Sequence, residues 1–383
     1  MIKVYCVDDS KPVLDVLSRL LSSDPEIDVV GQATNGEDAL VGIMSTLPDV
    51  VTLDIKMPGM SGLEVLKRIR SRAPIPVIIV SSYTQPGVRI TFEALELGAF
   101  DFIAKPASGK LSDLEKMKSE LVKLVKVADE FGRSKARHPG GVSKDEKPDS
   151  SGFGTEKPGS HKSFIAEERR RLGVLTKEAL SAIEAVGIGS STGGPFALTE
   201  FLPILPGSFP WPILVVQHMP PYFTSYFAKK LDAKCDVKVK EAENGEEALA
   251  GHVYIAPGDA HIRIEKADGV LFIKLDSTSD GHYACMPSVT ALFESMSRTL
   301  QDKSIGILLS GMGNDGADGL LMMKEAGAIT AVQDRTTSVV YGMPGSALKL
   351  GAAVETLKPS EIPLFIYNSV RKRAIIALHV SER

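Results

Sequence analysis

Short runs of β-branched and other apolar residues alternate with amphipathic segments over the first 125 residues of the chain. The apolar runs predict strands, whereas residues 13–21 carry apolar side chains at helical spacing. Alternating strands and helices are typical of a parallel sheet covered by helices on both faces. Five strands within about 105 residues fit a flavodoxin-like (βα)5 domain. The predicted strands are residues 4–7, 29–31, 50–53, 77–80 and 102–104.

A second alternation of apolar runs and amphipathic segments begins near residue 183. It predicts a second doubly wound, mainly parallel α/β domain over residues 183–383, larger than the first. Residues 371–383 are interpreted as a last helix or strand with ordinary packing. The other predicted strands are residues 185–188, 213–216, 253–255 and 305–309, and the predicted helices are residues 195–205, 222–231, 287–300 and 318–326.

The residues between these domains differ in composition. Residues 133–163 are rich in Gly, Pro, Ser, Lys and Glu and hold almost no large apolar residue. Such a segment cannot bury enough apolar surface to offset the entropy lost on ordering it. We therefore expect domains at residues 1–125 and 183–383, joined by a flexible linker over residues 126–182. The charge run at residues 167–171 is interpreted as a solvated helix start or linker end, with a docking patch as the alternative.

Composition narrows the class of protein. Of the 383 residues, 43% are hydrophobic and 24% charged, which is ordinary for a globular protein in water. Lys and Arg number 44 against 48 Asp and Glu, so the net charge of −4 predicts neither nucleic-acid binding nor attraction to anionic membranes. Three scattered cysteines suggest neither a disulfide framework nor a zinc site, and the chain shows no signal peptide or membrane-spanning run. We expect a cytoplasmic protein without direct membrane insertion.

Three aspartates and a lysine follow strands of the first predicted sheet. Asp8 and Asp9 end its first strand, Asp54 ends its third, and Lys105 follows its fifth. The carboxyl ends of parallel strands meet at one edge of the sheet, so these side chains should lie together. Carboxylates that face one another repel, and Mg²⁺ relieves that repulsion while keeping positions for water and phosphate. The set suits phosphorylation of Asp54, with Lys105 pairing a phosphoryl oxygen and the hydroxyl of Ser81 nearby.

These residues lie in segments that resemble the receiver domain of two-component response regulators. The segments are VDDS at 7–10, LDIKMPGMSG at 53–62, VSS at 80–82 and GAFDFIAKP at 98–106. The resemblance covers residues 1 to about 125. It implies that Asp54 is the phosphoacceptor, and that Mg²⁺ is bound by Asp9, Asp54 and the carbonyl of Lys56, with Asp8 close by. It also implies switch positions at Ser81 and Phe102, and a cis peptide bond before Pro106.

The second domain opens with a glycine-rich loop, GSSTGG at residues 189–194, between a predicted strand and a predicted helix. It reads as G-x-S-x-G, in which glycines permit the strained turn that exposes the central serine, here Ser191. Residues 187–193 are also one residue off the dinucleotide-binding fingerprint, so from the loop alone both interpretations stay open. A dinucleotide-binding site typically has an acidic residue at the end of the next strand, but this chain has Gln217 and His218 there.

The position of His218 favours the interpretation of Ser191 as a nucleophile over a dinucleotide-binding loop. The histidine follows the strand at 213–216 and should lie at the same sheet edge as Ser191. Asp315 stands in a glycine-rich turn after the strand at 305–309; a helix cap or a calcium-like loop is the alternative for this residue, although the EF-hand ligand order is absent. Together they predict Ser191 as nucleophile, His218 as general base and Asp315 as the orienting carboxylate, with backbone N–H groups of residues 311–313 or of the helix start at Pro195 as oxyanion donors.

Several motifs of the second domain resemble the CheB family of chemotaxis protein-glutamate methylesterases. They are IGSSTGG at 188–194, QHMPP at 217–221, YIAPGD at 254–259, LSGMGNDG at 309–316 and YGMP at 341–344. The resemblance runs from about residue 184 to about 355. It implies that Ser191, His218 and Asp315 form the triad, with Thr192 and Met312 lining the site. One departure is Met286, where the family is expected to carry an arginine before Pro-Ser-Val.

The two resemblances together imply an esterase activated by phosphorylation. Its substrates would be glutamate methyl esters of chemoreceptors, with glutamine deamidation as a second activity, and a chemotaxis histidine kinase would be the phosphodonor. Mg²⁺ would serve the receiver, no cofactor would serve the esterase, and the receiver would cover the serine site through an intramolecular interface. The rivals are a receiver with a DNA-binding output, opposed by the α/β output and the net charge, and one with a dinucleotide-dependent output.

Overall fold

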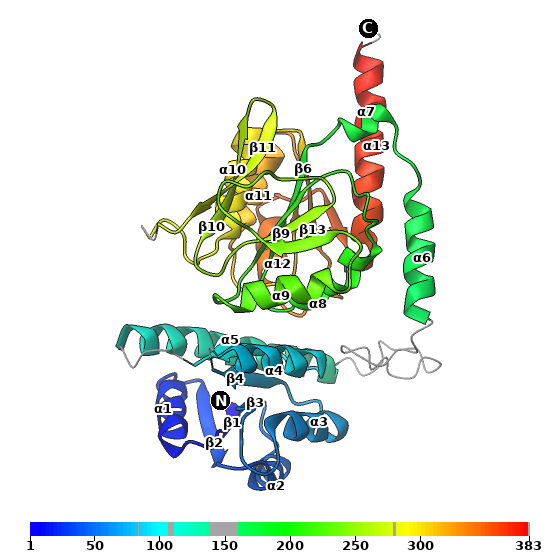
Figure 1. Ribbon diagram of the computed structural model, residues 1–383. Coiled ribbons are helices and arrows are strands. Elements are labelled where there is room, and N and C mark those ends of the chain that lie inside the picture. The colour runs from blue at the N-terminus through cyan, green and yellow to red at the C-terminus, as the bar shows by residue number, and fades with distance from the viewer. Residues whose placement is uncertain (83, 106–110, 138–159, 279–280, 382–383) are drawn as a thin grey trace. The chain divides into compact units, whose positions relative to one another are not determined.

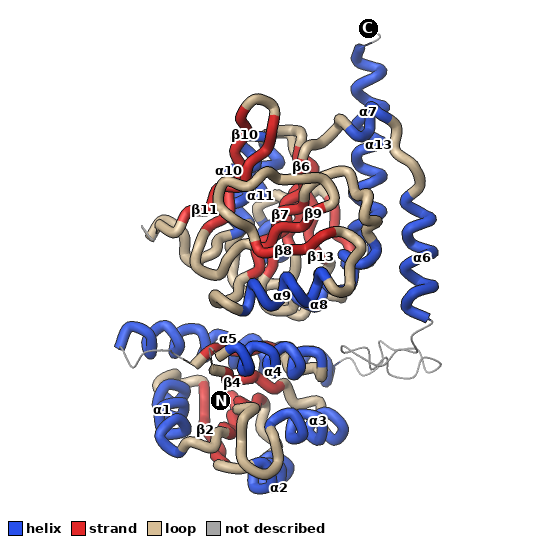
Figure 2. Tube along the Cα trace, viewed as in Figure 1, coloured by secondary structure: helices blue, strands red, loops and turns tan. Residues whose placement is uncertain are grey.

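The chain folds into two units, residues Met1–Glu156 and Lys157–Arg383 (Figure 1). The computed structural model describes all residues except 83, 106–110, 138–159, 279–280 and 382–383. Figure 2 shows the strands of each unit gathered in its interior, with helices around them. This arrangement is the α/β architecture that the alternating pattern predicts.

The first unit contains a five-stranded parallel sheet in the order β2-β1-β3-β4-β5. This is the flavodoxin-like strand order, and it confirms the predicted (βα)5 fold. The strands lie at or within two residues of their predicted positions, and β3 and β4 are buried throughout because helices cover both faces of the sheet. They are β1 (Ile2–Val7), β2 (Ile27–Ala33), β3 (Val50–Leu53), β4 (Val77–Ser81) and β5 (Asp101–Ala104).

Helices alternate with these strands and bury their apolar faces on the sheet. In α1, which contains the predicted stripe, Leu14, Leu17 and Leu21 are fully buried. A Pro at the start of this helix fits its fixed φ and missing N–H. The helices are α1 (Lys11–Ser22), α2 (Gly36–Thr46), α3 (Gly62–Arg72), α4 (Gln85–Glu96) and α5 (Leu111–Arg137).

The second unit contains a seven-stranded parallel sheet in the order β14-β13-β12-β6-β7-β9-β8. The chain starts in the middle of the sheet at β6, builds outward to β8, and then returns to the other side of β6. Strand order therefore reverses beside β6, where open α/β sheets place their sites. The strands are β6 (Ala185–Ser190), β7 (Ile213–Gln217), β8 (Lys238–Glu241), β9 (His252–Ile255), β12 (Ser304–Leu308), β13 (Ile329–Gln333) and β14 (Glu355–Leu357).

A two-stranded antiparallel ribbon, β10 (His261–Ala267) and β11 (Val270–Asp276), interrupts this α/β pattern. The sequence prediction named neither strand of the ribbon, nor β8, β13 and β14. The predicted helices are present with small shifts: α8 (Gly194–Phe201), continued by a 3₁₀ turn η1 (Leu202–Ile204), α9 (Phe223–Asp232), α10 (Val289–Leu300) and α11 (Ala317–Glu325). The remaining helix of the sheet layer is α12 (Gly342–Lys349).

Helices occupy parts of the range predicted as linker. Within it lie the end of α5, α6 (Ser160–Leu172) and α7 (Lys177–Leu180), while residues 138–159 lie outside the described residues. Arg169 of α6 donates to the carbonyls of Pro203 and Ile204 and pairs with Asp236, so this part of the charge run packs against η1 and the segment before β8 within the second unit. The boundaries 1–125 and 183–383 and the flexible linker stay predictions.

The C-terminal segment forms α13 (Ile362–Ser381), in which Ile366 and Val370 are fully buried. Its last turns carry exposed apolar side chains, among them Ile376. Among the described residues, no helix has the length and apolar content that crossing a membrane requires.

Candidate active site

Three predicted site residues follow three neighbouring strands of the second sheet. Ser191 comes directly after β6, His218 directly after β7, and Asp315 stands in the turn between β12 and α11. Since β6 lies between β12 and β7 and all three are parallel, the three loops leave the same edge of the sheet. The topology therefore brings together residues that are far apart along the chain.

The serine loop is held in a tight turn by its glycines and by the neighbouring loop. The N–H of Ser191 donates to the carbonyl of Ser310 at 3.0 Å. Gly193 adopts φ +84°, and a Cβ there would approach Ser310 Oγ and Val339 to 2.7 and 2.6 Å. Only glycine combines this left-handed backbone with so close a contact, so the loop sequence follows from its packing.

A buried glutamine connects the serine loop to the histidine loop. Gln217, at the end of β7, accepts a hydrogen bond from Ser190 Oγ at 2.7 Å and donates to the carbonyl of Ser191 at 3.0 Å. It also donates to the carbonyl of His218 at 3.2 Å. The sequence analysis used Gln217 only as evidence against a dinucleotide site. Its connecting role depends on strand pairing, and no local signal in the sequence indicates it.

The imidazole of His218 contacts the carboxylate of Asp315. Nε2 of His218 lies 2.8 Å from Oδ2 of Asp315, with both side chains largely buried. A carboxylate can only accept, so Nε2 carries the proton and Nδ1 is the nitrogen left to take one. Among the described residues no hydrogen bond joins Ser191 Oγ to His218; their loops meet through the N–H of His218, which donates to the carbonyl of Ser190 at 3.0 Å.

Asp315 is fixed at the N-terminus of α10. Its carboxylate accepts from the N–H groups of Val289 at 2.7 Å and Thr290 at 3.1 Å, and from the hydroxyl of Ser288 at 2.8 Å. Burial would raise the pKa of Asp315, but the hydrogen bond and charge of His218 and these backbone donors outweigh burial and hold the pKa well below its usual value. Asp315 is thus an orienting group that is ionised at neutral pH.

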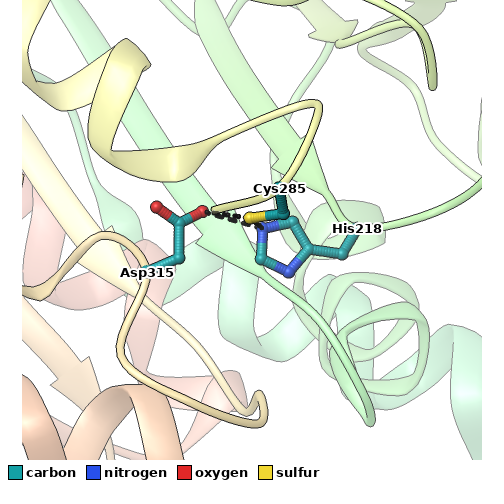
Figure 3. Close-up of side chains that lie close together, drawn as sticks. All are labelled: His218, Cys285 and Asp315. Atoms are coloured by element: carbon teal, nitrogen blue, oxygen red, sulfur yellow. Dashed lines mark hydrogen bonds and ion pairs between the residues drawn. The ribbon is translucent and has the colours of Figure 1, made fainter. Parts of the chain in front are cut away.

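The sequence analysis missed Ser288 and Cys285, which also contact Asp315. Ser288 is the N-cap of α10, because its hydroxyl oxygen accepts from the N–H of Ala291 at 3.3 Å; a serine before an apolar helical run was the available signal. Cys285 Sγ lies 3.3 Å from Oδ2 of Asp315 (Figure 3). The half-buried Met286 follows it, at the position where arginine was expected.

The two predicted lining residues lie in the loops that frame Ser191. Thr192 is buried, and its carbonyl accepts from Ser310 Oγ at 2.7 Å. Met312 is half-buried beside Gly311, where a Cβ would approach Ser191 Cβ to 2.9 Å. Gly311 therefore lies against the serine, and Met312 follows it directly in the chain.

The first unit carries a second candidate site, made of carboxylates. Oxygens of Asp8, Asp9 and Asp54 lie within 4.8 Å of one another at the carboxyl edge of the five-stranded sheet. Lys105 Nζ lies 2.7 Å from Oδ2 of Asp8 and 3.1 Å from Oδ2 of Asp54. The structure thus assembles the four predicted side chains.

Comparisons with known proteins agree with both sites. The response regulator receiver domain model matches residues 4–117, and the CheB methylesterase model matches residues 186–366. A protein-glutamate methylesterase/protein-glutamine glutaminase of Chromohalobacter salexigens is 40% identical over 363 residues, which are 94% of this chain and 94% of the relative. The chain belongs to the CheB methylesterase family. Its output domain is therefore a methylesterase domain rather than a DNA-binding or dinucleotide-binding one.

Other relatives extend over nearly the whole chain. A protein of the same description from Hydrogenovibrio crunogenus is 38% identical over 381 residues, covering 97% of this chain and 99% of the relative. Among solved structures, the Thermotoga maritima CheB methylesterase catalytic domain is 41% identical and covers 49% of this chain and 98% of that chain, with a TM-score of 0.47.

In this CheB family member, the acidic cluster of the receiver has the donor set of a hard cation. Burial raises the pKa of Asp54, Lys105 opposes that rise and Asp8 adds to it. Asp8 is fully buried and Asp9 is exposed, so the cluster reaches solvent on one side. An open pocket lined by Asp9, Lys56 and Met57 adjoins it. Clustered carboxylate oxygens with solvent access fit Mg²⁺, which keeps several of its waters.

The predicted switch residues of the receiver lie on β4 and β5. Ser81 is buried, and its hydroxyl is 2.6 Å from that of Thr91 on α4. Its carbonyl accepts from the N–H of Lys105, which ties the end of β4 to the lysine. Phe102 is half-buried and packs against the apolar core of the unit. Pro106, expected after a cis peptide bond, lies outside the described residues.

Proposed function

We propose that this chain is a phosphorylation-activated protein-glutamate methylesterase that hydrolyses glutamate methyl esters on chemoreceptors and deamidates receptor glutamines. Such a reaction serves sensory adaptation. One observation carries the catalytic assignment: the His218–Asp315 pair is fixed on the N-terminus of α10 beside the Ser191 loop. Family membership supports the substrate class.

In the proposed reaction, Ser191 Oγ attacks the ester carbonyl while Nδ1 of His218 accepts its proton. The resulting imidazolium forms against the ionised Asp315, which stabilises it and keeps the ring oriented. The proton then passes to the departing methoxide, so methanol leaves and an acyl-serine remains. A water molecule, deprotonated in turn by His218, releases the glutamate carboxylate and restores Ser191. With glutamine, the same steps release ammonia.

The negative oxygen of the tetrahedral intermediate needs donors that are already in place. We assign this role to backbone N–H groups beside Ser191, with Met312 as the principal donor and Thr192 lining the site. The close packing of Gly311, the residue before Met312, against Ser191 supports the assignment. Removing one donor of this kind costs about 10²–10³ in rate. The esterase chemistry requires no cofactor in this proposal.

The receiver would supply the control. Asp54 is the proposed phosphoacceptor, and Lys105 pairs with a phosphoryl oxygen of the transferring group. Mg²⁺ would be held by Asp9, Asp54 and the carbonyl of Lys56, with Asp8 close by, and when bound it would neutralise the charge of the carboxylates and the phosphoryl group. Ser81 and Phe102 would change position once Asp54 is phosphorylated. The cluster of carboxylates around Lys105 supports this assignment.

Coupling would run through an intramolecular interface of the two domains. We propose a receiver at residues 1–125, a flexible linker at 126–182 and a catalytic domain at 183–383. The unmodified receiver would obstruct the serine site, and phosphorylation by a chemotaxis histidine kinase would free it. A linker keeps the effective concentration of the tethered domains high, on the order of mM. The proposed location is the cytoplasm, where the kinase and the receptor substrate region meet.

Methanol release from methylated receptor membranes tests the proposal. We expect full-length protein to release methanol faster with acetyl phosphate and Mg²⁺ than without them. Ser191→Ala should abolish release, and Asp54→Ala should remove only the stimulation. Full release by Ser191→Ala would refute the catalytic assignment. A rate of methanol release that does not change with phosphodonor would be compatible with the esterase assignment but would refute activation by phosphorylation.

A further inference from the structure

Three different metal-ligating atoms meet beside the catalytic serine. Cys285 Sγ lies 3.4 Å from Nε2 of His218 and 3.3 Å from Oδ2 of Asp315, and these two atoms are 2.8 Å apart. Figure 3 shows the three side chains pointing toward one another from separate loops. Cys285 is in no disulfide, and the proposed reaction assigns it no step.

The triangle of atoms is close to that of a tetrahedral zinc site. Bond lengths of about 2.3 Å to sulfur and about 2.0 Å to nitrogen and oxygen place sulfur about 3.5 Å from the other two ligands. The same bond lengths place nitrogen and oxygen about 3.3 Å apart. The two distances from Cys285 Sγ already agree within about 0.2 Å, and only the His218–Asp315 distance must open, by about 0.5 Å.

We propose that His218, Cys285 and Asp315 form a reversible inhibitory site for Zn²⁺, with water in the fourth position. Binding replaces the hydrogen bond between Nε2 and Oδ2 with two bonds to the metal. The thiol loses its proton to solvent, and the proton of Nε2 is replaced by one on Nδ1 so that the ring stays neutral. One proton is released per bound ion when the ring starts neutral, so the affinity for Zn²⁺ increases with pH.

The surroundings of Asp315 already hold one ligand in place. Val289 and Thr290 donate their N–H groups and Ser288 its hydroxyl to the carboxylate, so its orientation is set before any ion arrives. Partners of this kind, which orient a ligand, strengthen metal binding. The cluster is only partly buried, which gives an ion access from solvent.

Bound Zn²⁺ would stop the reaction by taking the general base. Nδ1 is the nitrogen that accepts the proton of Ser191, and in the zinc form Nδ1 is already protonated. Inhibition would therefore act on the proton transfer itself and would be relieved by a chelator.

The ligand chemistry separates this site from the receiver's acidic cluster. Nitrogen and sulfur ligands favour Zn²⁺, whereas an all-carboxylate set favours Mg²⁺. The two clusters should thus respond to different ions within one chain. Because the receiver carboxylates can also take Zn²⁺, the Asp54→Asn variant provides the control for any effect exerted there.

Esterase activity of the full-length protein in metal-free buffer, titrated with ZnCl₂, gives the first test. Each variant is normalised to its own metal-free rate. We expect wild type and Asp54→Asn to be inhibited equally, with recovery on adding EDTA. Cys285→Ala should need at least about tenfold more Zn²⁺ for half inhibition, because losing a ligand costs no less than losing a residue that orients one. Cys235→Ala, which removes another thiol of the same unit, should behave as wild type. Equal inhibition of Cys285→Ala and wild type would overturn the proposal.

Co²⁺ gives a second readout that does not depend on activity. A tetrahedral Co²⁺ site with a thiolate ligand shows a thiolate-to-metal charge-transfer band and intense visible bands, which stoichiometric Zn²⁺ should remove. We expect these bands in wild type and Cys235→Ala and their loss in Cys285→Ala, with Cys285→Ser as the second variant. Absence of the charge-transfer band from wild type would refute the zinc site while leaving the esterase assignment untouched, whereas bands in a protein without esterase activity would support the site alone.

Discussion

Nε2 of His218 and Oδ2 of Asp315 lie 2.8 Å apart, although the two residues are separated by 97 positions in the chain. They follow β7 and β12, and β6, which carries the serine loop, lies between these strands in the sheet. The pair therefore spans the strand of the proposed nucleophile. Its carboxylate is anchored on α10, so the helix sets the position of the base.

Replacing Asp315 with asparagine should remove this control of the histidine. The amide presents a donor as well as an acceptor, so His218 can take the tautomer that has no free acceptor toward Ser191. We expect kcat for methyl-ester hydrolysis to fall by about 10⁴-fold, as for other triads with this change. The measurement is methanol release at saturating substrate. A loss smaller than about tenfold would argue that Asp315 only caps α10.

The same carboxylate should make the second unit sensitive to acid. The pKa of Asp315 is lowered in the fold, so its stabilising contribution is full above the unfolded value of 3.8 and is lost as pH falls toward the folded value. We therefore expect the stability difference between wild type and Asp315→Asn to shrink as pH decreases below about 4. Urea unfolding followed between pH 3 and pH 7 checks this, and a constant difference would contradict it.

Removing the hydroxyl of Ser288 should affect both α10 and the site. Ser288→Ala loses the helix cap, which costs about 1 kcal/mol, and a hydrogen bond to an ionised carboxylate, which costs about 1.5–3 kcal/mol. Ser297→Ala, at a half-buried position of the same helix, loses a hydrogen bond to a neutral carbonyl, that of Met322, and should cost less, about 0.5–1.5 kcal/mol. Denaturant unfolding of the second unit compares the two. Equal destabilisation by both variants would remove the special role of Ser288.

Gly193 and Gly245 allow two effects of an added Cβ to be measured apart, namely the strain of the backbone conformation and the steric clash with neighbouring atoms. Gly193 and Gly245 have φ +84° and +81°, but only at Gly193 would a Cβ strike neighbouring atoms. Alanine at either position should cost about 1–2 kcal/mol for the left-handed backbone. Gly193→Ala should cost about 1–3 kcal/mol more and reduce esterase activity, because its Cβ displaces the serine loop. Thermal unfolding and methanol release test this expectation. Equal loss of stability and equal activity of Gly193→Ala and Gly245→Ala would contradict it.

Neutralising Asp54 should stabilise the receiver when no divalent ion is present. Burial raises the pKa of this carboxyl, so above the folded pKa its charge destabilises the fold, and that effect vanishes below the unfolded value of 3.8. We expect Asp54→Asn to unfold at a higher temperature than wild type at pH 7 in EDTA. Added Mg²⁺ should reduce or reverse this difference in melting temperature, because the ion binds the wild-type carboxylates more tightly than the site of Asp54→Asn. A lower melting temperature for Asp54→Asn in EDTA would be evidence against this electrostatic account.

Local patterns predicted the elements that have strong apolar runs or glycine-rich turns. The five strands of the receiver and β6, β7, β9 and β12 of the second sheet are of this kind, and their order along the chain implied the parallel sheets. Two of the missed strands, β8 and β14, are short and have polar positions. Only one residue of β8 is buried, and β14 has three residues of which none is buried, so neither shows the continuous apolar run of a central strand.

The site likewise contains residues that local motifs predict and contacts that only the tertiary structure shows. Motifs at strand ends predict that Ser191, His218 and Asp315 lie at one sheet edge, and the structure confirms this placement. The contacts of Gln217 with the serine loop, of Ser288 with Asp315 and of Cys285 with His218 were not predictable, because the partners lie 26 to 67 positions away. Such contacts exist only once the strands have paired.

The sequence by itself determined the two domains, their α/β class, their family and the residue types available for chemistry. Those features can be predicted from local periodicity and short motifs, because each of these patterns spans only a few residues. Tertiary structure alone decided which side chains meet: the histidine nitrogen that pairs with Asp315, the helix that anchors that carboxylate, and the thiol beside both. The physical reason is that hydrogen bonds act over about 3 Å, and only the pairing of distant strands brings these groups within that range.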